Sequence, residues 1–372
     1  MHKKLFFLIG LCAVLHADEL REQTRRVAFQ SANSVIGLLP DGRKPKLDGI
    51  VSENEYVPGL TLAGFSNLKG PLIADKRGFV SMAMDAENLY LAVRTTTPNT
   101  DPGGGLRTQT FKNDMVQICG DDSVELSFCS DTEPDKVYHL ILNSFGAKYD
   151  RVVNIGSVQG TDVNWNCDGI RYENRIAEGF WTLEMQIPLK SIGSPSRSLR
   201  FLVGRNWSGA GTTNIVSANN HTDARQMMML RWDRKDIPSL EYKDLGIPEN
   251  GNWNVQLDLA GVPQGKSYEL CVLLQRHAYP KINGKVVPKI TDAAWAHRTL
   301  SGPGSVTLSH RTGDKNIYSL YVLLKDAQSG RYLHHRRMTG IRARNAGKFP
   351  ASGEFDQKEI GSGSVFHYPG YE

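Results

Sequence analysis

Apolar and polar residues alternate in short segments along most of this chain, and this alternation limits its fold more than any other feature. In Ser123–Phe128, the apolar residues Val124, Leu126 and Phe128 alternate with polar ones. The segments 181–187 and 255–259 alternate in the same way, and less regular strands are expected at 79–84, 89–95, 137–143, 199–205 and 318–324. Successive side chains of a strand point to opposite faces, so each alternating segment has one face for a core. The sequence therefore predicts an all-β fold of antiparallel sheets packed face to face.

Helical signals are few, and turn-forming residues divide the chain. The segment 188–193 suits one helical turn that ends at Gly193, and residues 18–30 suit either a short charged helix or a mobile arm. A turn-rich stretch at 246–253 marks a boundary between two domains. The expected organisation is an N-terminal arm over 18–33, a β-sandwich over 34–247, a smaller immunoglobulin-like β-sandwich over 252–346 that contains a hairpin at 318–331, and a loosely ordered tail over 347–372.

The first 17 residues have the plan of a secretory signal peptide. Lys3 and Lys4 precede an almost unbroken apolar run from Leu5 to Leu15, and Ala17 precedes an acidic pair. This run is too short to span a bilayer, and no later segment is apolar enough to do so. We therefore expect export to a secreted or periplasmic location, without stable insertion into a membrane. The formal net charge of +5, with acidic and basic residues interspersed, provides no basic surface for nucleic acid.

Four cysteines follow the signal, namely Cys119, Cys129, Cys167 and Cys271. An even number of cysteines permits disulfides in an oxidising compartment, and Cys167 is the easier partner for either Cys119 or Cys129, which flank one strand. Cys271 lies in an apolar strand, where a buried free thiol is expected. The sequence contains no C-x-x-C pair that would indicate a zinc or redox site.

Several local motifs between residues 34 and 247 occur in a specific order. They are Lys46–Tyr56 (KLDGIVSENEY), Asp85–Val93 (DAENLYLAV), Asp122–Leu126 (DSVEL), His139–Gly146 (HLILNSFG) and Trp181–Pro188 (WTLEMQIP). In this order they resemble carbohydrate-binding module family 9-like (DOMON/CBM9-like) domains. The resemblance implies an antiparallel β-sandwich that holds a saccharide or polysaccharide. Asp48, Asn88 and Asp122 within these motifs suit turns and strand entries, with contact to a ligand or to calcium as the alternative.

Saccharide binding needs aromatic rings for the C–H faces of a sugar and polar groups for its hydroxyls. Trp165, Trp207 and Trp232 have polar neighbours and are the candidate stacking residues, whereas Trp181 alternates with apolar residues and belongs to the core. Arg205 and Asn206 are the candidate polar contacts. The resemblance implies that Trp232 matches one of two sugar-stacking Trp residues of the family and that His139 matches a polar contact. The segment 115–120 carries no counterpart of the other Trp.

The resulting hypothesis is an exported, non-catalytic carbohydrate-binding protein that acts in polysaccharide catabolism and has no cofactor apart from a structural calcium ion that the family would allow. The segment 252–346 offers a surface for a protein partner. Two alternatives remain open. A related branch of the fold binds haem, for which Met227–Met229 with His221 or His139 would supply ligands. The chain could also serve as an accessory part of a glycoside hydrolase, although it carries no catalytic signature. The basic cluster His334–Arg337 is interpreted as a solvated strand edge.

Overall fold

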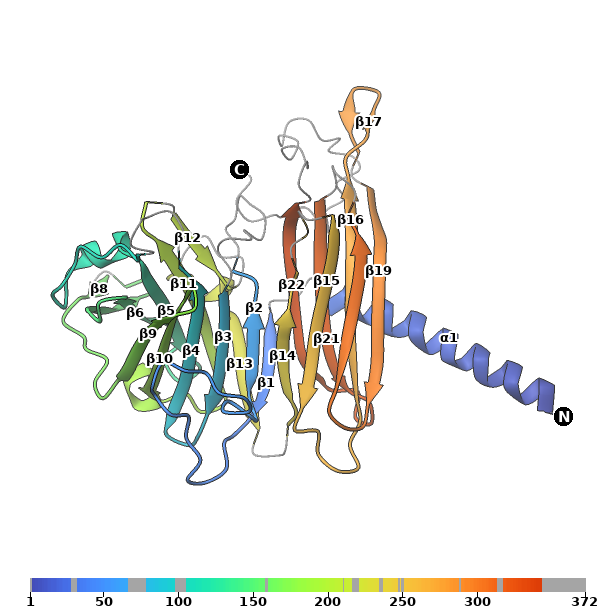
Figure 1. The fold of residues 1–372 in the computed structure, drawn as a ribbon, viewed down its shortest axis with the longest axis horizontal. Coiled ribbons are helices and arrows are strands. Elements are labelled where there is room, and N and C mark those ends of the chain that lie inside the picture. Colours follow the sequence, from blue (N-terminus) through green and yellow to red (C-terminus); the bar gives the residue numbers. More distant parts are fainter. Residues whose placement is uncertain are drawn as a thin grey trace.

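The computed structural model describes residues 2–27, 32–65, 78–97, 105–157, 160–209, 211–215, 221–233, 237–246, 248, 251–287, 289–312 and 317–342, with side chains in the first helix from residue 15 onward. Two large β-sheets and one N-terminal helix, α1 (His2–Val27), make up the fold (Figure 1). The prediction of a β protein is therefore confirmed, with α1 as its one long helix among the described residues. Within that part of the chain, no helix is long and apolar enough to cross a membrane.

The larger sheet has twelve strands. In spatial order they are β19 (Lys289–Leu300), β16 (Tyr268–Ala278), β21 (Ile317–Asp326), β22 (Tyr332–Arg342), β1 (Asn33–Gly37), β13 (Met228–Asp233), β11 (Ser198–Trp207), β5 (Ser123–Ser130), β6 (Lys136–Asn143), β7 (Lys148–Asn154) and β8 (Thr161–Asp162), with β12 (Gly211–Asn214) paired to β11.

The second sheet has eight strands. In spatial order they are β20 (Gly304–Arg311), β15 (Asn252–Ala260), β14 (Ser239–Asp244), β2 (Leu60–Ala63), β3 (Gly78–Met84), β4 (Asn88–Thr96), β10 (Phe180–Pro188) and β9 (Arg171–Ala177). The remaining elements are a small hairpin of β17 (Lys281–Ile282) and β18 (Lys285–Val286), and the 3-10 helices η1 (Val116–Gly120), η2 (Leu189–Ile192) and η3 (Ala224–Gln226).

The sheets are mixed, whereas the sequence predicts purely antiparallel ones. β1 is parallel to β13, and β2 is parallel to β14. Parallel neighbours cannot be joined by a tight hairpin, and here each parallel pair joins an early strand to one that follows much later in the chain. Local alternation predicts the strands but carries no information about such distant pairings.

Strands on both sides of the predicted domain boundary belong to the same two sheets. β14, which ends at Asp244, and β15, which begins at Asn252, are hydrogen-bonded neighbours, and β22 pairs with β1. A single hydrophobic core contains Phe201 and Met228 from before the predicted boundary and Trp253 and Tyr318 from after it. A separate immunoglobulin-like sandwich is therefore not confirmed, because the later strands extend the sheets and the core of the earlier ones.

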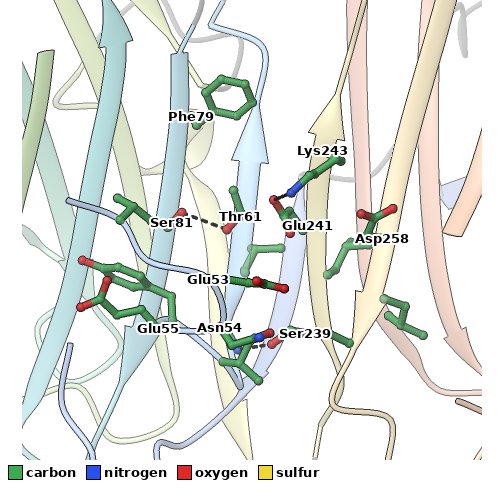
Figure 2. Close-up of a pocket in the computed structure, with 18 of the residues that line it drawn as sticks. Glu53, Asn54, Glu55, Thr61, Phe79, Ser81, Ser239, Glu241, Lys243 and Asp258 are labelled. Carbon is green, nitrogen blue, oxygen red and sulfur yellow. Dashed lines mark hydrogen bonds and ion pairs between the residues drawn. The ribbon is translucent and has the colours of Figure 1, made fainter. Parts of the chain in front are cut away.

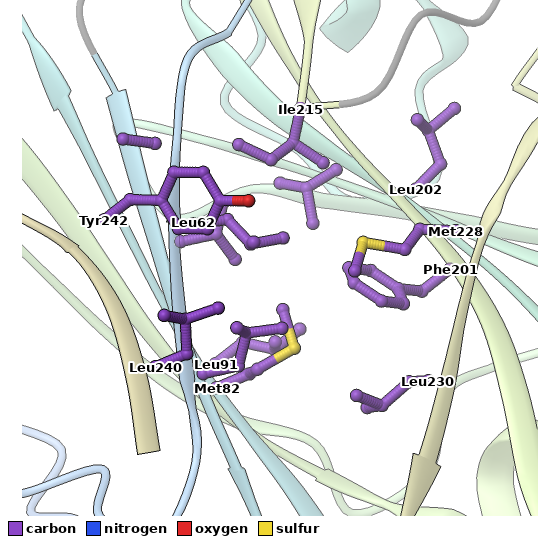
Figure 3. Close-up of a cluster of buried hydrophobic side chains, with 14 of the residues drawn as sticks. Leu62, Met82, Leu91, Phe201, Leu202, Ile215, Met228, Leu230, Leu240 and Tyr242 are labelled. Carbon is purple, nitrogen blue, oxygen red and sulfur yellow. The ribbon is translucent and has the colours of Figure 1, made fainter. Parts of the chain in front are cut away.

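The alternating segments bury their apolar faces between the two sheets, as predicted. Figure 3 shows Leu62, Met82 and Leu91 from the eight-stranded sheet facing Phe201 and Met228 from the twelve-stranded sheet. Trp181 is fully buried, as its place in an alternating segment indicated. The prediction that this ring belongs to the core is confirmed.

Two of the motifs that carry the family resemblance, 46–56 and 181–188, contact each other and stabilise the fold. The buried carboxylate of Glu184 accepts hydrogen bonds from the backbone N–H groups of Asp48 and Gly49, at 3.0 and 2.7 Å, and from the hydroxyl of Tyr56 at 2.9 Å. Gly49 has a φ of +74°, and a Cβ atom there would lie 2.4 Å from the Cβ of Arg175. This turn therefore requires glycine. Glu184 closes the 48–56 loop over the outer face of β10.

The C-terminal half of α1 packs on the outer face of the twelve-stranded sheet. Leu20 and Val27 bury against Cys271 and Leu323. Of the two alternatives for 18–30, the helix is therefore correct as far as residue 27, and the buried thiol of Cys271 is confirmed. Cys119, Cys129 and Cys167 are also free thiols, so the pairing expected with Cys167 is absent. The predicted tail at 347–372 lies outside the described residues.

The interpretation of His334–Arg337 as a solvated edge is wrong. β22 is an interior strand, and His334, His335 and Arg336 are buried in it. The Arg336 guanidinium donates hydrogen bonds to the backbone carbonyls of Ala63, Gly64 and Ile215. Such backbone acceptors explain how a basic side chain can be accommodated in the interior.

Candidate functional site

A cluster of polar side chains lies on the outer face of β5, β6 and β11, opposite the core. In β5, Val124 and Leu126 are buried between the sheets, so Glu125 points to the other face. Cross-strand register places Glu125 opposite Gly204 of β11, and Asn206 lies two residues further along β11 on the same face. His139 of β6 also belongs to this face, opposite Ser127.

Glu125 is the centre of the cluster. Its Oε1 atom lies 2.6 Å from Nε2 of His139 and 2.5 Å from Nδ1 of His221, and its Oε2 atom accepts a hydrogen bond of 3.1 Å from the Asn206 amide. The Asn206 carbonyl oxygen in turn accepts a hydrogen bond of 2.5 Å from the hydroxyl of Thr212. The Glu125 and His221 side chains retain 11% and 16% exposure. The cluster is therefore ordered by internal hydrogen bonds but still reaches the surface.

The charges of the two central groups are set by their surroundings. Burial raises the pKa of Glu125, but hydrogen bonds from His139 and His221 lower it more strongly, so its pKa lies well below the ordinary value. Burial lowers the pKa of His139 and outweighs the opposing effect of Glu125. At neutral pH the cluster thus combines an anionic Glu125 with a neutral His139.

The geometry of Glu125, His139 and His221 also tests whether a metal ion fits. Their ligand atoms lie within 4.8 Å of one another, and among the described residues this is the one such group. However, Nε of Arg151 donates a hydrogen bond of 3.0 Å to Nδ1 of His139, which leaves the proton on Nε2, facing Glu125. A metal-ligating histidine instead presents a bare nitrogen to the metal and donates its other N–H outward. Calcium prefers six to eight oxygen ligands, whereas this cluster supplies one carboxylate. The cluster therefore fits a hydrogen-bonded network better than a metal site.

Of the six residues predicted to contact a ligand, the structure brings His139 and Asn206 together. Arg205 and Trp207 lie on the opposite face of β11, buried between the sheets. Arg205 forms an ion pair of 2.7 Å with Asp122, and its guanidinium lies over the rings of Trp181 and Trp207 at 4.9 and 4.3 Å. The surroundings of Arg205 and Trp207 are thus those of a buried structural cluster.

The other two candidate Trp residues are half-buried. Trp165 follows β8, and the centroid of its ring lies 5.2 Å from that of the Tyr138 ring. Trp232 lies in β13, opposite Ile36 of β1. Each ring packs partly against the core, so each keeps only part of its surface for a ligand.

Sequence reasoning missed Glu125 as a site residue and named His221 only as a candidate haem ligand. The alternation around Glu125 already placed it opposite the core residues of its strand, so this signal was available. His221 comes from a segment without periodicity and is far from Glu125 in sequence, so no local pattern connects the two.

Met228, one of the three Met residues suggested as haem ligands, occupies a different environment from the two suggested histidines. Met228 lies in the core beside Phe201 (Figure 3), whereas His139 and His221 bind Glu125 on the outer face of the sheet. An axial Met–His pair must approach one iron from two sides of a flat ring. Met228 and these two histidines therefore do not form such a pair.

A second surface feature is a groove of about 660 Å³ on the outer face of the eight-stranded sheet (Figure 2). Cross-strand register aligns Ser81, Thr61, Glu241 and Asp258 on four neighbouring strands along its floor. Lys243 pairs with Glu241 at 3.3 Å. The groove offers hydroxyl and carboxylate groups. Its aromatic rings are those of the buried Tyr56 and the half-buried Phe79.

No protein-family model and no curated protein matches the sequence. A proposed carbohydrate-binding protein from Bacteroides uniformis matches with 10% identity and a TM-score of 0.43, over 55% of this chain and 100% of that chain. A family 9 carbohydrate-binding module from Caldicellulosiruptor kristjanssonii, solved with cellotriose and with glucose, matches with 12% identity and a TM-score of 0.37. These matches cover 55% of this chain and 94% and 96% of the module. The structural neighbours over 55% of this chain include a family 9 carbohydrate-binding module and a proposed carbohydrate-binding protein.

Proposed function

We propose that this protein is exported and binds a saccharide without altering it chemically, and that the cluster around Glu125 is its binding surface. The observation that carries the proposal is the ordered set of Glu125, Asn206, His139 and His221 on the outer face of the sheet, where Glu125 and His221 reach the surface above the buried His139 and Asn206. A sugar hydroxyl both donates and accepts hydrogen bonds, and this set presents carboxylate, amide and imidazole groups together. The order of family motifs in 34–247 supports the same assignment.

The cluster has the properties of a pre-organised site for hydroxyl groups. The anionic carboxylate of Glu125 accepts hydrogen bonds, and such charge-assisted bonds are stronger than those between neutral groups. Because the neighbouring side chains already hold it in place, little conformational entropy is lost on binding. Trp165 and Trp232 pack against the core, on the other face of the sheet from Glu125, so we do not assign them as stacking contacts of this cluster.

The number of carboxylates favours binding over hydrolysis. Glycoside hydrolysis needs two carboxyl groups on either side of the scissile bond. Glu125 is the one carboxylate among the residues that bond to one another in this cluster, and the nearby Asp122 is held by Arg205 on the other side of the sheet. A role beside a polysaccharide-degrading enzyme would be compatible with a chain that only binds.

The proposal predicts that Glu125→Gln weakens saccharide binding by roughly 10- to 100-fold, because hydrogen bonds to a charged group contribute about 1.5–3 kcal/mol. A glycan array identifies the saccharide, and isothermal titration calorimetry then compares the affinities of the two proteins. Glu241→Gln in the groove of Figure 2 is the matched control and should bind like the unmodified protein. Equal affinity of all three proteins would show that the cluster is not the binding surface.

A further inference from the structure

Two aromatic rings are exposed at the end of the sheet that carries the Glu125 cluster. Phe111 is 59% exposed and Phe145 is 61% exposed. Among the described Phe, Tyr and Trp residues, these two are the ones whose side chains are largely exposed. The rings touch edge to face, with centroids 4.8 Å apart and an interplanar angle of 89°. Met115, in the same loop as Phe111, and Val116, at the start of η1, are also exposed.

The backbone beneath these two rings is held by buried polar side chains. The amide of Asn143 donates a hydrogen bond of 2.7 Å to the carbonyl of Thr110, the residue before Phe111. The side-chain oxygen of Asn143 accepts a hydrogen bond of 3.2 Å from the backbone N–H of Phe145. Asp121 fixes the same loop by accepting hydrogen bonds from Thr110 N–H and from Asn143, at 3.1 and 3.0 Å. Both ring positions are therefore anchored through Asn143, which is fully buried.

A row of hydrogen bonds connects this anchor to the proposed binding cluster. Asn143 lies opposite Ser123 in cross-strand register, and Ser123 lies opposite Asn206. The Asn206 amide donates hydrogen bonds to the hydroxyl of Ser123 and to Glu125, both at 3.1 Å. Ile141 of β6 lies opposite Glu125 in cross-strand register. Phe145 follows Ile141 by four residues in the chain. Four residues of chain span at most about 14 Å, so one oligosaccharide can reach both features.

We propose that Phe111 and Phe145 form the aromatic platform on which a saccharide stacks while its hydroxyls bond to the Glu125 cluster. This inference rests on the proposed function and assigns its main apolar contact to these two rings. In an edge-to-face pair, one ring exposes its face and the other exposes its edge beside it. A pyranose whose hydroxyls are equatorial has a flat C–H face that can stack on such a surface. The anionic Glu125 disfavours acidic sugars. The ligand class is therefore a neutral oligosaccharide of glucose- or xylose-type units.

The test is calorimetry of the full chain with neutral hexasaccharides of glucose and of xylose, and with hexagalacturonate as the acidic comparison. The double variant Phe111→Leu with Phe145→Leu keeps the apolar character but removes both rings. We expect it to lose roughly 10-fold or more in affinity, because it removes both ring faces on which a sugar can stack. The variant Phe111→Trp retains a ring and should bind like the unmodified protein.

The controls separate failure of this inference from failure of the proposed function. Ile176→Ala removes another exposed apolar side chain, on β9 of the opposite sheet, and should leave affinity unchanged. If the Leu variant binds within twofold of the unmodified protein while Glu125→Gln is weakened, the platform is wrong but the cluster stands. If no variant changes the affinity, both fail. Loss of self-association in the Leu variant by light scattering, without a change in saccharide affinity, would identify the ring pair as a protein contact and overturn the platform.

Discussion

Asp122→Asn is expected to lower the free energy of unfolding by about 3–5 kcal/mol, because it leaves a fully buried Arg205 without its counter-ion. Burial already disfavours the charged guanidinium and lowers the pKa of Arg205 to about 10. The Asn side chain keeps an oxygen for the backbone N–H of Arg107, which now donates to Asp122 at 2.6 Å. Its NH2 group then faces the guanidinium of Arg205, which now donates to the second Asp122 oxygen, so the variant loses both the charge and this hydrogen bond, and urea unfolding measures their joint cost.

A second variant separates the ion pair from general damage at this position. Arg205→Met combined with Asp122→Asn removes both charges and places an apolar chain between the rings of Trp181 and Trp207. We expect the double variant to recover much of the stability lost in Asp122→Asn, since replacing both members of a buried pair costs less than removing one. A loss below about 1 kcal/mol in Asp122→Asn would show that the pair is not essential to the fold.

The protein should also lose several kcal/mol of stability as the pH falls from about 6.5 to about 4. Burial lowers the pKa of His277 and of His335 to about 4 in the folded state, from an ordinary value of 6.5. Because the unfolded chain binds these protons first, the stability is fully present above pH 6.5 and is lost as the pH falls through this window. Each histidine then contributes a loss of about 2 kcal/mol at pH 5 and about 3 kcal/mol at pH 4. His334, buried and bonded to Ser34 and Tyr242, acts in the same direction.

Thermal unfolding at pH 8, 6.5, 5 and 4 measures this dependence. His277→Gln provides the control, because the Gln amide can still bond to the Ser319 hydroxyl that now lies 2.8 Å from Nε2 of His277. This variant should show a drop between pH 8 and pH 5 that is smaller by about 2 kcal/mol. A stability that stays constant from pH 7 to pH 5 would mean that these histidines are not held neutral by burial.

The sequence predicted the strands and part of the candidate site, for identifiable reasons. Strands with one apolar face, such as 123–128 and 181–187, were found because their periodicity is local. The buried position of Arg205 could also be predicted locally, because Arg205 has the same spacing as Phe201 and Val203 on the core face of β11. Its neighbours Asn206 and Trp207 led instead to the prediction of a ligand contact. The period of a strand predicts which face of the sheet a side chain occupies, whereas the chemical type of the residue alone does not.

Other features depend on contacts between distant segments. No local pattern indicates that β1 enters between β13 and β22, and this insertion is what joins the two halves of the larger sheet. The contact of His221 with Glu125 and the pairing of Phe111 with Phe145 have the same origin. In each case the partners are brought together by the topology of the sheet rather than by their spacing in the chain.

A crystal structure with the tightest-binding neutral oligosaccharide tests the central claim most directly. We predict that a sugar hydroxyl lies within hydrogen-bond distance of the Glu125 carboxylate and that a neighbouring sugar ring stacks on Phe111 and Phe145. Density for the oligosaccharide in the groove of Glu241 and Asp258 (Figure 2), or anywhere else away from Glu125, would contradict the account.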